Sequence, residues 1–174
     1  FGIKERLDCL QWIAYAKERF GKETPIVLMG ISMGAATVLM ASGEELPDNV
    51  RGVIADCPFS SPKEIIQTVM RSLKLPVRLL YPLVKLSAAI FGNFDLEEVS
   101  PAEAVKKSTV PILFIHGDDD RFVPCSMGQA CYDSCMSQKQ IFLVRGAGHG
   151  LSHCVDAKGY EETVDGFLDK VLGK

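Results

Sequence analysis

Apolar runs alternate with amphipathic stretches along the chain. Residues 5–20 carry apolar side chains at helical spacing and end at Gly21, which predicts a helix. A continuous apolar run follows at residues 25–30, bounded by proline and glycine, and this pattern is typical of a strand buried on both faces of a parallel sheet. Residues 32–42 then predict a helix rich in alanine and methionine.

Further apolar runs predict three more strands, at residues 50–56, 111–117 and 140–144. Helical patterns occupy residues 126–136 and 159–172. Because strands and helices alternate, we expect an α/β fold with a parallel sheet of about four strands flanked by helices. The length fits a single domain over residues 1–174.

The stretch between the second and third predicted strands is too long for a simple crossover. Residues 61–107 contain two or three apolar helical segments broken by prolines. We expect these segments to form a helical cap, inserted over the carboxyl edge of the sheet.

Composition and charge bear on which partners the protein binds and in which compartment it works. The 19 basic and 22 acidic side chains give a net charge of −3 without a basic patch, so we expect no nucleic-acid partner. Six cysteines in a chain of this length indicate free thiols, and no CxxC pair supports a zinc site at Cys131 and Cys135 with His149 or His153. No signal peptide or spanning segment is visible, which favours a cytoplasmic protein.

Residues 30–34 read Gly-Ile-Ser-Met-Gly, a GxSxG motif between a predicted strand and a predicted helix. Such a tight turn strains the backbone of Ser32, so we expect only small residues to fit at positions 30 and 34. It also lifts the Ser32 hydroxyl above the sheet, where the N–H of Met33 favours developing negative charge. The alternative is a glycine-rich turn that binds an anion, as in nucleotide-binding folds.

Two further loops carry candidate chemistry. The loop at residues 116–124, HGDDDRFVP, follows the third strand and offers three aspartates at the sheet edge where an orienting carboxylate belongs. A solvated acidic turn and a magnesium site are alternatives, but no phosphate-binding loop accompanies them. The loop at residues 146–150, GAGHG, follows the fourth strand and leaves the ring of His149 free to reach Ser32. His153 is the alternative base, and we expect His116 to make a structural hydrogen bond.

These three motifs, in the order Ser…Asp…His, resemble the α/β-hydrolase superfamily over nearly the whole chain. The sequence is similar to the bacterial serine esterase and prolyl-oligopeptidase-like branches, which residues 54–59 also resemble. The resemblance implies that Ser32 is the nucleophile, His149 the base and Met33 an oxyanion-hole donor. It also selects Asp120 as the acid, because the family's aspartate is the third residue after the His-Gly pair.

Relatives of this kind carry about four more strands before the helix that begins here. The chain therefore resembles a C-terminal part, without the loop that supplies the second oxyanion donor. The edge formed by residues 26–29 would be bare and apolar. We expect a second copy of the chain, or a missing N-terminal segment, to cover it.

The resemblance implies a serine hydrolase that cleaves carboxylic esters through an acyl-enzyme, with a small-molecule ester as substrate and with no cofactor or metal. The apolar side chains of residues 61–107 indicate an acyl pocket, although they would serve equally to pack the cap on the core. A peptidase or thioesterase with the same triad is one alternative. An inactive truncated hydrolase acting as an interaction module is another, and a flavodoxin-like binding domain is a third.

Overall fold

Four parallel strands form the centre of the computed structural model, which describes residues 1–173. The strands are β1 (Ile26–Ile31), β2 (Val50–Asp56), β3 (Ile112–Gly117) and β4 (Lys139–Val144). They lie in the order β1-β2-β3-β4, and each neighbouring pair is parallel. The predicted α/β class, with a parallel sheet of about four strands flanked by helices, is confirmed.

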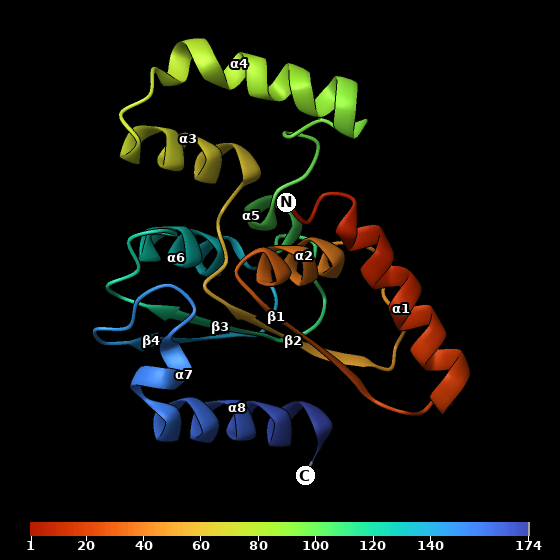
Figure 1. Cartoon of the computed structure of the whole chain (residues 1–174). Coiled ribbons are helices and arrows are strands. Elements are labelled where there is room, and N and C mark those ends of the chain that lie inside the picture. The colour runs from red at the N-terminus through yellow and green to blue at the C-terminus, as the bar shows by residue number, and fades with distance from the viewer. Residues whose placement is uncertain (174) are drawn as a thin grey trace.

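Helices cover both faces of this sheet (Figure 1). One face is covered by α2 (Met33–Ser42) and α6 (Cys125–Ser134), with α1 (Glu5–Phe20) packed against α2. The other face is covered by α8 (Ala157–Leu172), which follows the short helix α7 (Ser152–Val155). Successive side chains of β2 point to opposite faces, so Val53 joins the core beneath α2 while Ile54 joins the core beneath α8.

Strand β1 is an edge strand, and its burial differs from the prediction. The sequence predicted burial on both faces, but Met29 and Ile31 are about half exposed. Strands β2 and β3 each have a neighbour on both sides, and β3 is buried along its whole length. Strand β1 is paired on one side only, so its apolar side chains are incompletely covered.

The segment at residues 61–107 lies between β2 and β3 and is helical, as predicted. It contains α3 (Pro62–Ser72), α4 (Val77–Ser87), the π-helix η1 (Ala88–Gly92) and α5 (Pro101–Ala104). The Ser61 side chain accepts a hydrogen bond from the Glu64 N–H and so caps α3. Helix α3 packs inward through Ile65, and α4 lies outside α3 (Figure 1). Among the described residues, no helix combines the length and apolar character that crossing a bilayer requires.

The turn from β1 into α2 is strained at Ser32, as its sequence predicted. Ser32 has φ 55° and ψ −114°, a conformation that non-glycine residues rarely adopt, and its N–H donates to the Asp56 carbonyl at 2.8 Å. A Cβ at Gly30 would lie 2.3 Å from the Gly34 carbonyl group, so only glycine fits there. At Gly34, by contrast, a Cβ would meet nothing within 4 Å, so alanine also fits there.

The bare edge of β1 generates a prediction about association. We predict that a second copy of the chain or a further segment of polypeptide pairs with this edge, since it presents unpaired backbone groups and apolar side chains. Light scattering should show a mass that rises with concentration, and Met29→Lys should reduce this rise because a charge on an edge strand opposes pairing. A constant monomer mass at high concentration would contradict the prediction.

The two glycines of the turn generate a second prediction. Gly30→Ala should lower the free energy of unfolding by about 1–3 kcal/mol, because the new methyl group overlaps the Gly34 backbone. Gly34→Ala is the matched control and should be neutral or stabilising by up to about 1 kcal/mol, since alanine favours the helix. Urea denaturation measures both, and equal stabilities for the two variants would contradict the steric explanation.

Candidate active site

Ser32, Asp120 and His149 meet at the carboxyl edge of the sheet. Ser32 follows β1, Asp120 lies in the loop after β3, and His149 lies in the loop after β4. His149 Nε2 is 2.9 Å from Ser32 Oγ, and His149 Nδ1 is 2.8 Å from Asp120 Oδ2. With the carboxylate as acceptor, Nδ1 donates, which leaves Nε2 to accept from the Ser32 hydroxyl. The three residues singled out from separate motifs therefore form one hydrogen-bonded chain.

The Asp120 carboxylate is held rigidly on the side away from His149. Its side chain is fully buried, and its Oδ1 accepts hydrogen bonds of 2.9 Å from the backbone N–H groups of Phe122 and Val123. His116 makes the structural hydrogen bond that the sequence predicted, since its Nε2 donates to the Val123 carbonyl at 2.9 Å. These contacts fix Oδ2 in the direction of His149.

The alternative candidates take other positions. Asp118 accepts a hydrogen bond from the backbone N–H of Gly146, and Asp119 pairs with the exposed side chain of Arg121. His153 is exposed and pairs with Glu161 on α8. None of them contacts Ser32 in the part of the chain that the structure describes.

The first turn of α2 lies directly beside the Ser32 hydroxyl. Serine at a helix N-cap usually accepts a hydrogen bond from the first turn, but Ser32 makes no such bond and its Oγ instead lies against His149. The leading N–H groups of α2 have no partner within the helix, and that of Met33 is the first of them. This end of the helix can therefore stabilise negative charge that develops next to Ser32.

Cys57 is a neighbour of the site that the motifs did not indicate. The Cys57 sulfur, a carboxylate oxygen of Asp120 and a ring nitrogen of His149 all lie within 4.8 Å of one another. Among residues 1–173 this is the one group of three side chains that could together bind a metal ion. Burial raises the pKa of Cys57 to about 12, so the thiol is neutral near pH 7 and is a poor nucleophile. Cys131 and Cys135 are buried elsewhere, and no zinc-binding cluster forms around them in the described chain.

Asp56 is a second residue that the sequence reasoning missed. Its carbonyl accepts the Ser32 N–H, while its buried carboxyl group accepts a hydrogen bond from Ser152, just beyond the histidine loop. Burial raises the pKa of Asp56, and hydrogen bonds from Tyr160 and Ser152 partly offset this effect. An aspartate at the carboxyl end of a strand was the signal used for Asp120, and the same signal would have found Asp56.

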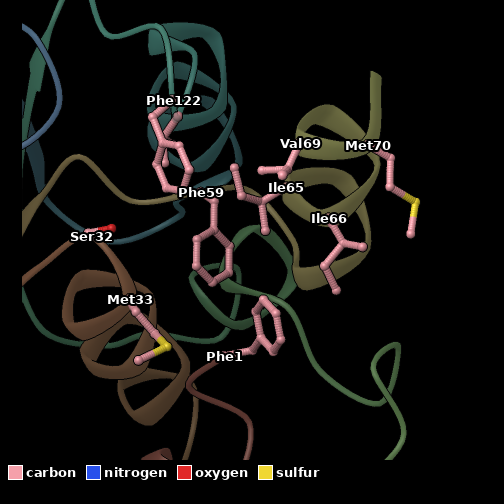
Figure 2. Close-up of a pocket in the computed structure, with 10 residues that line it drawn as sticks. Phe1, Ser32, Met33, Phe59, Ile65, Ile66, Val69, Met70 and Phe122 are labelled. Atoms are coloured by element: carbon pink, nitrogen blue, oxygen red, sulfur yellow. The ribbon is translucent and has the colours of Figure 1, made fainter. Parts of the chain in front are cut away.

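An apolar cavity of about 400 Å³ opens beside Ser32 (Figure 2). Its outer wall is α3, which contributes Ile65, Ile66, Val69 and Met70. Every other lining residue is apolar as well, apart from Ser32 itself. The Phe122 ring lines the cavity and lies edge-on to the His149 imidazole, with ring centroids 5.0 Å apart. The cavity therefore suits an apolar group attached to an atom that Ser32 can reach.

Curated proteins match this chain over part of their own length. The chain is 30% identical to the uncharacterized protein YqkD of Bacillus subtilis over 172 residues, which is 98% of this chain and 56% of that protein. It is 25% identical to the protein bem46 of Schizosaccharomyces pombe over 152 residues, which is 84% of this chain and 44% of that protein. The chain thus spans about half the length of the curated relatives it matches.

Solved structures share the fold at low sequence identity. An esterase of Pyrococcus furiosus, Pf2001, matches 99% of this chain and 63% of its own with a TM-score of 0.73 and 22% identity. Acetyl xylan esterase 1 of Thermoanaerobacterium matches 95% of this chain and 52% of its own with a TM-score of 0.69 and 21% identity. An acylaminoacyl peptidase of Pyrococcus horikoshii matches 98% of this chain and 28% of its own, with a TM-score of 0.70 and 19% identity.

These solved structures share the parallel α/β fold of this chain. The model of one family within that fold matches residues 2–174, almost the entire sequence. The chain therefore belongs to the prolyl oligopeptidase family of serine hydrolases.

Proposed function

We propose that this chain cleaves carboxylic esters through an acyl-enzyme, with Ser32 as nucleophile, His149 as base and Asp120 as the orienting acid. The observation that supports the proposal is the continuous hydrogen-bonded chain from Ser32 Oγ through the imidazole to the carboxylate, with distances of 2.9 and 2.8 Å. A nucleophile, a base and a group that orients the base are the parts that acyl transfer requires.

In the first half of the reaction, His149 Nε2 takes the hydroxyl proton while Ser32 Oγ attacks the ester carbonyl. The Met33 N–H, at the start of α2, donates to the oxyanion of the tetrahedral intermediate. The imidazolium then returns the proton to the departing alkoxide, so that an alcohol leaves and an acyl group remains on Ser32. Asp120 holds the Nδ1–H throughout, which keeps Nε2 directed at the reacting atoms.

In the second half, water takes the place of the alcohol. His149 removes a proton from a water molecule while the water oxygen attacks the acyl carbonyl. The second tetrahedral intermediate then collapses, and Ser32 Oγ is the leaving group. The proton held on Nε2 returns to Ser32 Oγ, and the carboxylic acid departs. Each step moves a proton over one short hydrogen bond, and these steps require no metal ion or organic cofactor.

The cavity beside Ser32 is the proposed acyl pocket. A volume of about 400 Å³ with apolar walls accommodates an alkyl or aryl acyl group and offers no charged side chain to a polar substrate. Burial of each methylene group there contributes about 0.8 kcal/mol. Substrates with apolar acyl groups of moderate length should therefore bind better than acetyl esters.

Two alternatives follow from the family. A peptidase or thioesterase would use the same three residues, and the structural neighbours include an acylaminoacyl peptidase as well as esterases. An inactive module that binds a partner is the other, because the chain spans about half the length of its curated relatives. If this chain is part of a longer protein, we propose the same ester hydrolysis for that protein.

We predict that Ser32→Ala lowers the rate of p-nitrophenyl ester hydrolysis by about 10⁴–10⁶-fold and abolishes labelling by a fluorophosphonate probe, because the attacking oxygen is lost. Ser87→Ala, at the exposed end of α4, is the control and should keep both properties. Absence of labelling in the unaltered chain would favour the inactive module, and equal labelling in Ser32→Ala would remove Ser32 from the mechanism.

We predict that Ile66→Trp changes acyl-length preference without abolishing activity. Ile66 lines the cavity on α3, so an indole there fills part of the space that a longer acyl chain would occupy. The kcat/KM ratio of octanoate to acetate p-nitrophenyl esters should fall about 10–100-fold. Leu7→Trp, on exposed α1, should leave the ratio unchanged. An unchanged ratio in Ile66→Trp would place the acyl group outside this cavity.

A further inference from the structure

The outermost helix of the molecule carries an apolar stripe on its exposed face. Leu79, Leu83, Leu86 and Ile90 are spaced three or four residues apart along α4 and η1, so they lie on one side of the helix. Each is 55–67% exposed. Helix α4 is the helix farthest from the sheet, with α3 between them (Figure 1).

The stripe is not the face that attaches α4 to the rest of the molecule. Tyr81 is buried on the opposite side of the helix, and its hydroxyl donates to Glu97. Leu73 and Leu75 before α4 and Phe91 after it are exposed as well. An exposed apolar stripe of this kind usually marks a site of interaction, because exposure of apolar side chains to water is unfavourable.

The charge around the stripe differs in sign from that of the whole chain. Residues 62–92 contain five basic side chains and one acidic side chain, although the net charge of the protein is −3. Lys63 and Lys85 are neutralised by ion pairs with Glu97, and Lys85 also pairs with Asp95.

Three other basic residues, Arg71, Lys74 and Arg78, make no ion pair within residues 1–173. All three lie at the corner where α3 ends and α4 begins. Lys74 lies between Leu73 and Leu75 in the sequence, and Arg78 directly precedes Leu79. An exposed apolar surface is thus bordered by uncompensated positive charge.

We propose that the outer face of α4 docks on an anionic lipid surface. Leucine side chains of the stripe would enter the boundary between headgroups and acyl chains, and the three basic residues at the corner would contact lipid phosphates. A second copy of this chain is a poorer occupant. A symmetric contact would set two copies of the same positively charged face against each other, and residues 65–92 contain no acidic side chain to compensate that charge.

Co-sedimentation with vesicles tests the proposal. The chain should bind vesicles that contain phosphatidylglycerol much more strongly than vesicles of phosphatidylcholine alone, and added salt should weaken binding because it screens the phosphates. Leu83→Ser should weaken binding by about tenfold or more, since it removes a side chain from the apolar boundary. Lys74→Gln should weaken it by about fivefold on anionic vesicles only.

The controls separate docking from folding and from catalysis. Leu7→Ser changes a leucine of similar exposure on α1, 50% against 57% for Leu83, and should leave vesicle binding unchanged. Ser32→Ala should also bind normally, because docking does not require hydrolysis. Circular dichroism should show that Leu83→Ser is folded.

Two results would overturn the proposal. One is a Leu83→Ser variant that binds vesicles no more weakly than the unaltered chain, which includes the case in which neither protein binds. The other is a dimer that Leu83→Ser converts to a monomer in light scattering, because that result would assign the stripe to a second copy of the chain.

Discussion

The hydrogen bond from the Ser32 N–H to the Asp56 carbonyl is the contact on which the site depends. It extends the pairing of β1 with β2 one residue beyond β1, where the chain has already turned into a positive φ. The close approach of Gly30 to Gly34 permits this turn, and the turn exposes the serine oxygen instead of letting it cap α2. Strain at one residue is therefore balanced by the sheet pairing around it.

Asp120 and His149 depend on the same sheet. Strands β3 and β4 end at the edge where β1 ends, so the loops after them converge on Ser32. Backbone N–H groups hold Asp120 from one side, and the carboxyl group of Asp56 contacts Ser152 beyond the histidine loop. Asp56 thus contacts both the turn at Ser32 and the segment that follows His149.

The helical segment at residues 61–107 has apolar surfaces with different surroundings. The inner side of α3 closes the cavity beside Ser32, where Ile65 and Phe59 are buried. The outer side of α4 exposes leucines next to uncompensated basic residues. Composition alone showed that this segment is apolar, and packing decided which side chains face the cavity beside Ser32 and which face outward.

The sequence by itself determined the strands and most helices and singled out Ser32 and His149, because strand-end motifs report local backbone geometry. The family resemblance selected Asp120 among the three aspartates of its loop. Only the tertiary structure decided what depends on neighbours distant in the chain: the half-exposed side of β1, the open space at Gly34, and the placement of Cys57 and Asp56. The spacing of apolar residues along the sequence indicates which side chains are buried. Which residues they contact is decided only when separate helices and strands pack together.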